Sequence, residues 1–533
     1  MTKPNIEPRR QLLKTTAAGS MIAATGSFGL RNAISAGLTE RTDRAHRTNF
    51  THATAPQDGF SGSFENVPDT FGPTKIAFDR PLPPTLRGTL FRNGPARMQR
   101  GGLRYQHWFD GDGMVHSFQI GDQTLTHQAR MIRTDRSVAE EKAGRLLWNG
   151  FGTSVPGSRS VNHPDDMNVG NISVLPLPAT QGNSKSKSNE ILALWEAGSP
   201  WRLDANSLQT LGRKVFSEQT DGLPFSAHPR IDPDGRIWNF GYLSGSGKLA
   251  LYDLGATGRL KRVAMIDAPN ADMVHDFAIT PRYLVFVLAP LRFRNPDKPG
   301  AGSAASFAER LHWDDKGSVH VVLVSKESLR IEHRFELPPF FSFHLGNAWE
   351  DKNTVRIEVA RAGSFSKLMQ QIVQATTGQA LTEQPAQPGL ADIVLDLTNK
   401  SAKLQPRPGS GIDFPRFDQR YTGLPTQHLF MLGRSPQMPA LVFGFNRITA
   451  LHRQDTDQHF DYAVDEIAEE HVFVAAPGKP QGVGWLVGTA YNWQTRRSVL
   501  SVFDTGAIAA GPIAQARLPY GLPLGLHGQF VPA

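Results

Sequence analysis

The stretch FSAHPRIDPDGRIWNFGY, residues 225–242, decides the fold class. Asp234-Gly235 is a hairpin-turn signal, and the β-branched and aromatic residues around it predict two short antiparallel strands. One histidine, His228, stands just before the first of these strands. Runs of the same kind, each about five to nine residues long, recur between turn residues from about residue 60 onward. The sequence therefore predicts an all-β protein.

Many strands at close spacing over roughly 470 residues exceed what one β-sandwich holds, whereas a β-propeller of four-stranded blades accommodates them. Exact internal repeats are absent, so the residues themselves do not give the number of blades. Asp110-Gly111 and Asp112-Gly113 are further Asp-Gly pairs, and we interpret them as hairpin turns rather than as a calcium loop, because the EF-hand spacing is missing.

Four histidines that are distant in sequence share one context. Each lies at the end or the start of a short apolar run, and they are His228, His275, His344 and His527. Neutral imidazole is the commonest metal ligand in proteins, and four imidazoles without a thiolate suit iron, copper, nickel or zinc better than magnesium or calcium. Distant ligands of this kind meet only in a radially closed fold, which a propeller provides. His107 and His116 lie in more polar surroundings and are weaker ligand candidates.

Three carboxylates stand in apolar surroundings, and these are Glu196, Asp413 and Glu470. An unpaired carboxylate is costly to bury, and a metal-bound imidazole normally donates its second N–H to a carboxylate. These three residues are therefore candidates for holding the metal-binding histidines in place.

The composition excludes several classes of site. The chain of 533 residues has no cysteine, so disulfides, iron–sulfur clusters and cysteine nucleophiles are ruled out. The net charge is +8, but Lys and Arg are dispersed, and we expect a solvated basic surface and no nucleic-acid partner. No phosphate-binding loop, serine-hydrolase elbow or HExxH motif occurs.

The N-terminus predicts an export signal. Pro8–Lys14 reads PRRQLLK and precedes a weakly apolar stretch rich in small residues, the pattern of a twin-arginine signal peptide. We expect a signal peptide over residues 1–36, a disordered lead-in over 37–59 and one propeller domain over 60–533. The export machinery would then be a partner, and the mature protein would be periplasmic.

Three stretches interrupt the strand pattern. Residues 175–189 form a polar loop, and residues 293–317 are rich in Gly, Ala, Ser and charge, with a helical turn indicated near Ala308. Residues 364–392 contain Leu368, Ile372 and Val373 at helical spacing, which predicts a helical insertion on one face of the propeller. The sequence leaves open whether this helix closes a tunnel, contacts a membrane surface or packs as an ordinary helix.

Taken together, the motifs RNGP, FDGDGMVH, LWEAGSPWRLD, MVHDFAIT, FHLGNAWED, FPRFD and LHGQF resemble the carotenoid cleavage oxygenase family. The resemblance covers roughly residues 60–533. It implies a seven-bladed β-propeller with loop and helix insertions over the metal face, and one Fe(II) on the axis. By motif position, His228, His275, His344 and His527 would bind the iron, and Glu196, Asp413 and Glu470 would hold three of these histidines. The family usually has Glu where this chain has Asp413, so we expect a water bridge or a backbone shift there.

The resemblance also implies cleavage of a C=C bond by O2 to give two carbonyl products. A carotenoid or apocarotenoid is the favoured substrate, and a stilbene is the alternative. Stilbene-cleaving members use a Tyr and a Lys, for which Tyr105 is a candidate, but Arg136 stands near the expected Lys. An isomerase of the same family and a propeller that only binds a hydrophobic ligand also remain open. A calcium-dependent propeller lactonase would leave the four histidines unexplained.

Overall fold

A computed structural model describes residues 59–177, 190–294, 305–385, 387–408, 411–453 and 456–533. The predicted signal peptide (1–36) lies outside the described residues, as does all but the last residue of the predicted lead-in (37–59). Most of the predicted polar loop, from residue 178 to residue 189, also lies outside them.

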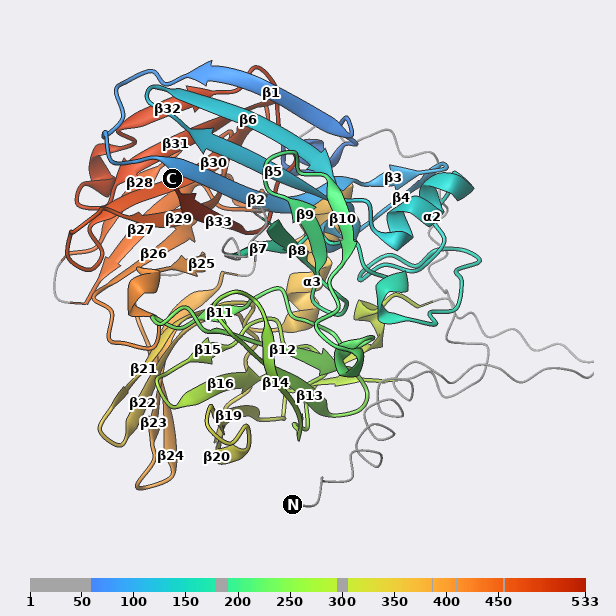
Figure 1. Ribbon diagram of the computed structural model, residues 1–533, viewed down its shortest axis with the longest axis vertical. Helices are drawn as coiled ribbons and strands as arrows, with labels where there is room; N and C mark the ends of the chain where they lie inside the picture. Colours follow the sequence, from blue (N-terminus) through green and yellow to red (C-terminus); the bar gives the residue numbers. More distant parts are fainter. Residues whose placement is uncertain (1–58, 178–189, 295–304, 386, 409–410, 454–455) are drawn as a thin grey trace, which may run out of the picture.

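Seven antiparallel sheets are arranged as the blades of a β-propeller, which confirms the predicted fold class (Figure 1). Blade 1 has five strands in the order β1-β6-β5-β2-β33. Its strands are β1 (Thr70–Ala77), β2 (Gly88–Arg97), β5 (Asp112–Ile120), β6 (Thr124–Met131) and β33 (Gly528–Pro532). Blade 2 comprises β7 (Ser173–Leu177), β8 (Glu190–Leu194), β9 (Trp201–Asp204) and β10 (Thr210–Arg213).

Blades 3 to 7 each have four strands that follow one another along the chain. Blade 3 comprises β11 (Arg230–Ile231), β12 (Ile237–Leu243), β13 (Lys248–Leu254) and β14 (Leu260–Asp267). Blade 4 comprises β15 (Ala278–Ile279), β16 (Tyr283–Leu288), β19 (Val319–Ser325) and β20 (Ile331–Leu337). Blade 5 comprises β21 (Leu345–Asp351), β22 (Thr354–Arg361), β23 (Gly389–Asp396) and β24 (Ser401–Pro406).

Blade 6 comprises β25 (Ile412–Arg416), β26 (His428–Gly433), β27 (Arg447–His452) and β28 (Gln458–Asp461). Blade 7 comprises β29 (Glu466–Ala475), β30 (Gly484–Asn492), β31 (Arg497–Asp504) and β32 (Ala514–Arg517). Two small ribbons lie outside the blades: β3 (Gln99–Arg100) with β4 (Leu103–Arg104), and β17 (Leu291–Phe293) with β18 (Leu311–Trp313).

The ring is closed by pairing between distant parts of the chain. Strand β33 pairs antiparallel with β2, with Phe91 opposite Gln529, so that residues near 530 complete the first blade. Strand β33 also contacts β7 of blade 2 and β29 of blade 7. Figure 1 shows the blue strands of blade 1 beside the red strands of blade 7. The innermost strand of blade 1 is therefore supplied from the other end of the ring.

The Asp-Gly pairs behave differently from one another. Asp234-Gly235 forms the predicted turn between β11 and β12. The prediction of hairpin turns at Asp110-Gly111 and Asp112-Gly113 is wrong, because Asp110 ends the 3-10 helix η2 (Trp108–Asp110) and Asp112 begins β5. Asp110 instead accepts hydrogen bonds from Thr153 Oγ1 and from the Gly152 amide, which turns its side chain inward.

Two α-helices occur in the described residues, α2 (Asp135–Ala143) and α3 (Phe365–Thr377). Helix α3 is the predicted insertion within blade 5; it follows Ser364 and is capped after Thr377 by Gly378, whose φ of 70° is the left-handed conformation that glycine adopts readily. Leu368 and Ile372 are buried and Val373 is half-buried. The helical turn expected near Ala308 is the 3-10 helix η5 (Ala308–Arg310). Neither α-helix has the length and apolar character needed to cross a membrane.

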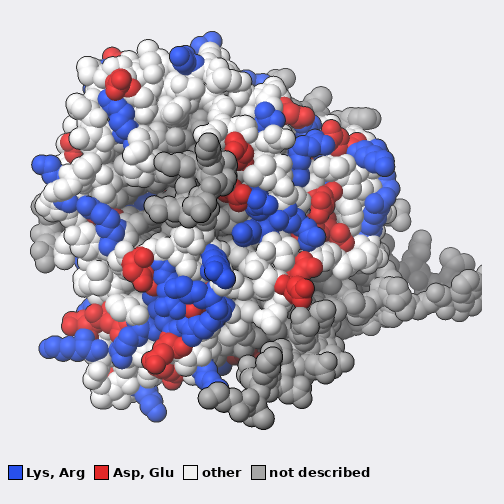
Figure 2. All heavy atoms as spheres, in the orientation of Figure 1, with Lys and Arg blue, Asp and Glu red and all other residues white. Residues whose placement is uncertain are grey.

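Basic and acidic side chains are interspersed over the face shown in Figure 2, with one denser basic group in its lower half. Paired charges also line a groove between blades 3 and 4, where Arg236 and Arg262 both contact Asp253, and Lys326 contacts Asp232. Opposite charges are thus paired along this groove.

Candidate metal centre

The four histidines stand at equivalent places in four blades. His344 and His527 directly precede the inner strands β21 and β33, while His228 and His275 lie shortly before the inner strands β11 and β15. The inner strands surround the propeller axis, so side chains at the same end of these strands approach one another there. This placement explains why the histidines border apolar runs in the sequence.

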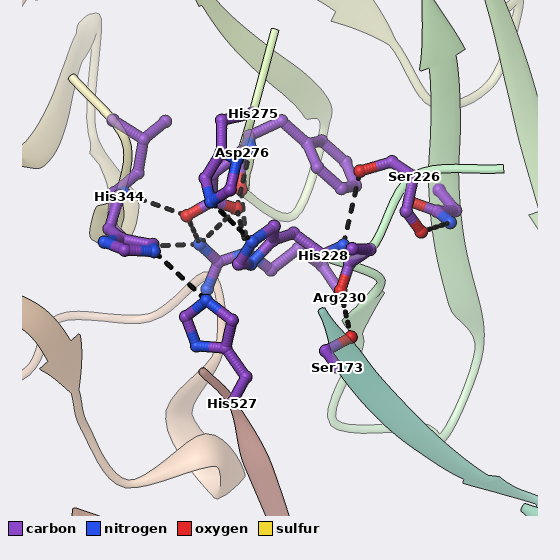
Figure 3. A network of polar contacts seen from close by, with 12 residues as sticks. Ser173, Ser226, His228, Arg230, His275, Asp276, His344 and His527 are labelled. Atoms are coloured by element: carbon purple, nitrogen blue, oxygen red, sulfur yellow. Dashed lines mark hydrogen bonds and ion pairs between the residues drawn. The ribbon is translucent and has the colours of Figure 1, made fainter. Parts of the chain in front are cut away.

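The structure brings all four imidazoles together. One ligand atom from each ring can be chosen so that all four lie within 4.8 Å of one another. His228 Nε2 lies 3.0 Å from His275 Nε2, and His344 Nε2 lies 3.2 Å from His527 Nε2. Figure 3 shows the four rings directed toward a common region. Two nitrogens that each lie about 2.1 Å from one ion at a right angle would be about 3.0 Å apart, so these spacings fit a shared ion.

Three of the imidazoles contact the three carboxylates singled out in the sequence. His275 Nδ1 hydrogen-bonds to Glu196, His344 Nδ1 lies 2.8 Å from Asp413 Oδ1, and His527 Nδ1 lies 2.9 Å from Glu470 Oε1. A carboxylate accepts, so each Nδ1 donates its proton and each Nε2 is left with a lone pair that faces the axis. The carboxylates come from blades 2, 6 and 7, whereas the histidines come from blades 1, 3, 4 and 5.

Asp413 reaches its histidine directly. A water bridge is not needed, because the backbone changes course beside the carboxylate: the pairing of β25 with β26 shifts register between Asp413 and Arg416. Phe414, the next residue, has a φ of 56°, which is uncommon for a residue with a bulky side chain. A bulged strand therefore compensates for the side chain that is one methylene shorter than Glu.

His228 differs from the other three histidines. Its Nδ1 lies 4.0 Å from Asp276 Oδ1, beyond hydrogen-bond distance, and Asp276 is instead bound by Arg230. The side chain of His228 is 12% exposed, whereas the side chains of His275, His344 and His527 are 3, 8 and 7% exposed. His228 is thus the least restrained and the most accessible of the four.

Sequence reasoning missed two arginines beside the site. Arg416 Nε and Nη2 donate to the two oxygens of Glu470 at 2.9 and 2.7 Å. Arg230 Nη2 donates to both oxygens of Asp276 at 2.9 and 2.7 Å. These arginines could have been recognised from the sequence. Each is a single basic residue within a few positions of a predicted ligand or carboxylate, in an otherwise apolar run, as in HPRI and DFPRF.

Burial and these ion pairs set the charge of the site. Burial lowers the pKa of His527 to about 4, and burial together with the neighbouring imidazoles lowers the pKa of His228 well below its usual value. Burial also acts on His344, but the Asp413 carboxylate outweighs it and raises the pKa of that ring. Burial disfavours the Glu470 anion, yet Arg416 and His527 outweigh it and hold the pKa of the carboxyl far below its ordinary range. The lowered pKa values of His228, His527 and Glu470 favour the neutral imidazoles and the anionic carboxylate that metal binding requires, whereas a metal ion at His344 would compete with a proton.

An apolar cavity opens on one side of the imidazoles. It is bordered by His275, His344 and His527 and, among others, by Phe109, Ile172, Phe343, Leu368, Ile372 and Phe414. Leu368 and Ile372 belong to α3, so the helical insertion covers this cavity. A hydrophobic molecule that occupied the cavity would lie against the imidazole cluster in surroundings that exclude water.

The remaining sequence candidates lie outside this group. Tyr105 and Arg136 are buried and face each other, with Arg136 Nη2 donating to Tyr105 Oη at 2.8 Å and Glu140 completing the cluster. Neither side chain borders the apolar cavity, so the geometry gives no support to the prediction that they bind substrate. The reason is that Arg136 is occupied by Tyr105, Glu140 and three backbone carbonyls.

His107 and His116, the weaker ligand candidates, are also placed elsewhere. His107 Nδ1 accepts from the Phe109 amide at the start of η2, and His116 Nδ1 lies 3.2 Å from His127 Nε2 within blade 1. Neither belongs to the four-imidazole group.

Comparisons with known proteins agree with this arrangement. The family model described as "Retinal pigment epithelial membrane protein" matches residues 67–532. The chain is 29% identical over 500 residues to the apocarotenoid-15,15'-oxygenase of Synechocystis sp., covering 89% of this chain and 96% of that protein. It is 25% identical to the isoeugenol monooxygenase of Pseudomonas nitroreducens, covering 86 and 94%. The crystal structure of cobalt-substituted Synechocystis apocarotenoid oxygenase aligns with a TM-score of 0.78 at 25% identity, covering 89% of this chain and 98% of that one.

Proposed function

This chain belongs to the carotenoid cleavage oxygenase family, and we propose that it is a non-haem Fe(II)-dependent dioxygenase that cleaves a C=C bond of a carotenoid or apocarotenoid. When bound, the iron would activate O2, and both oxygen atoms would enter the broken double bond to give two carbonyl products. The observation that carries the proposal is the convergence of four imidazoles at the end of an apolar cavity. Neutral nitrogen ligands of this kind suit iron among other transition metals.

The residues of the chain would perform three tasks. His228, His275, His344 and His527 would hold the metal, and Glu196, Asp413 and Glu470 would fix the orientation of three of these rings. The apolar lining would align an extended polyene beside the metal and keep water away. The overall reaction, in which an alkene and O2 give two carbonyl compounds, neither takes up nor releases a proton.

Product analysis tests this proposal. The protein is loaded with Fe(II) and incubated under ¹⁸O2 with a panel of apocarotenoids and hydroxystilbenes, and the products are identified by mass. We expect two carbonyl products from an apocarotenoid, each containing one labelled oxygen before exchange with water. His275→Ala should lose both the bound metal and the activity. Metal-loaded protein that consumes no O2 with any member of the panel would favour a binding protein, and a product with an intact carbon skeleton would favour an isomerase.

A stilbene-type substrate is the second candidate, because the chain is 25% identical over 478 residues to the resveratrol cleavage oxygenase 1 of Aspergillus fumigatus, and resveratrol is a hydroxystilbene. The hydroxystilbenes in the panel distinguish it from the first. The buried pairing of Tyr105 with Arg136 favours the polyene, since neither group borders the cavity to bind a phenol.

We further propose that the protein acts in the periplasm after export by the twin-arginine route, on the strength of the PRRQLLK motif. Because that route carries folded proteins, the metal would be bound before export. Cell fractionation of the wild-type chain and of a variant with both Arg9 and Arg10 replaced by Lys tests this. The wild-type chain should be found in the periplasm and the variant in the cytoplasm.

A further inference from the structure

A second cavity reaches the imidazoles from the other side. It is bordered by His228, His344 and His527 and by polar groups that include Ser173, Arg230, Asp276, Arg416, Glu470 and Gln529. We call it the axial polar cavity. His228 borders only this cavity and His275 borders only the apolar one, so the imidazole cluster separates the two.

The chain direction shows that the cavities lie on opposite sides of the cluster. Phe343 borders the apolar cavity and Leu345 the axial polar cavity, with His344 between them. In the same way, Leu526 borders the apolar cavity and Gly528 the axial polar cavity, with His527 between them. Because the inner strands begin directly after these histidines, the axial polar cavity lies within the ring of inner strands.

The charges that line the axial polar cavity are balanced. Arg230 is bound to Asp276 and Arg416 is bound to Glu470, which pairs two guanidinium groups with two carboxylates. Figure 3 shows Arg230 and Asp276 beside the four rings. A hydrated cation that moved along this cavity would therefore meet polar side chains and no net positive charge. The apolar cavity offers few polar groups to a hydration shell, and an ion without its hydration is costly to bury there.

The outer end of the axial polar cavity is spanned by two glutamines. Gln419, from the 3-10 helix η6 (Gln419–Tyr421), is exposed, and Gln529 of β33 is half-buried. Gln529 Nε2 donates to Gln419 Oε1 at 2.9 Å. A second, longer hydrogen bond of 3.5 Å runs from Gln419 Nε2 to Gln529 Oε1. These two bonds between neutral side chains from blades 6 and 1 are weak enough to break and re-form.

We propose that the axial polar cavity is the route by which a hydrated divalent metal ion reaches and leaves the centre, with the two glutamines at its mouth and His228 as the first imidazole that the ion meets. The apolar cavity on the other side then remains dry for the organic substrate. His228 fits this role because it is the most exposed of the four and lacks a carboxylate at hydrogen-bond distance. The inference rests on the metal centre of the proposed function.

Metal release tests the route without any substrate. The full-length protein is loaded with Co(II), mixed with excess EDTA and passed through gel filtration at successive times, and the cobalt retained per chain is measured by elemental analysis. Gln419→Trp should plug the mouth and slow release by about tenfold or more. Gln419→Ala should remove the contact with Gln529 and speed release. Uptake of Co(II) by metal-free protein should change in the same directions.

Gln387→Trp is the matched control, because Gln387 is also exposed but borders the apolar cavity. It should leave the release rate within about twofold of wild type. The inference is overturned if Gln387→Trp slows release while Gln419→Trp does not, or if all variants release cobalt at the wild-type rate. Melting temperatures show whether each variant is folded, and Gln419→Ala still tests the route if the tryptophan variant is not. A wild-type chain that binds no Co(II) or Fe(II) would instead contradict the proposed function itself.

Discussion

At the scale of single residues, adjacent carboxylates have separate tasks. Glu469 and Glu470 follow each other in β29, yet Glu470 contacts His527 and Arg416, whereas Glu469 contacts Arg92 and Thr489 at the junction of blades 7 and 1. The candidate metal centre and the closure of the ring thus depend on neighbouring positions of one strand.

Glu470→Gln should weaken metal binding by about 10- to 100-fold, because His527 loses an anionic partner and Arg416 is left without its counter-charge. Equilibrium competition with a chelator of known affinity measures the change. Glu469→Gln is the control: it should lower the free energy of unfolding by about 3–5 kcal/mol, since it leaves Arg92 buried and unpaired, while metal affinity stays near wild type. Equal loss of metal affinity in both variants would contradict this division.

The residues also mark what the sequence could predict. The four histidines and three carboxylates could be predicted from the sequence, because each lies in or beside an apolar run, where a buried polar group needs a partner. The roles of Arg230 and Arg416 could not be predicted from the sequence, since each arginine binds a carboxylate that lies 46 or 54 positions away in the chain. The turn prediction at Asp110 failed for the same reason, because Thr153 is the distant partner that orients the carboxylate.

At the scale of secondary-structure elements, the sequence predicted correctly those elements whose formation depends on neighbouring residues alone. The hairpin at Asp234-Gly235 and helix α3 follow from turn chemistry and from apolar spacing. The number of blades did not follow from the strands, because the blades share no exact repeat, and β33 joins β2 across most of the chain. The number of seven blades could be predicted only from the family resemblance.

Helix α3 should influence substrate binding and not metal binding. Leu368→Asn places an amide in the wall of the apolar cavity and should raise the KM for an apocarotenoid by about tenfold, with metal content unchanged. Leu368→Met, which nearly conserves volume and apolar character, should keep the wild-type KM. Steady-state kinetics on metal-replete protein provide the measurement, and an unchanged KM in the asparagine variant would remove α3 from the substrate-binding wall.

At the scale of the whole molecule, buried neutral histidines predict a loss of stability in mild acid. Burial lowers the pKa of His107 to about 3 and that of His127 to about 4, whereas both rings titrate near 6.5 in the unfolded chain. Below about pH 6.5 the unfolded state therefore binds more protons than the folded state, and the free energy of unfolding falls as the pH decreases toward 4.

Replacing His127 with Gln should make this decline shallower, by at most about 1.4 kcal/mol per pH unit. Urea denaturation at several values between pH 7 and pH 4.5, with chelator present in every sample so that metal loss does not contribute, measures the slope. An identical slope in the variant and the wild type would show that His127 is not buried in its neutral form.

The position of His527 directly before β33 has a consequence for damaged molecules. The strand that joins the two ends of the ring carries, in its preceding residue, one of the four proposed ligands. If that strand detaches from β2, the histidine leaves with it, and a molecule that has begun to open would no longer hold the proposed metal ion with all four ligands. The proposed metal-dependent reaction would then be confined to molecules whose ring is closed, so that loss of activity would report the first step of unfolding.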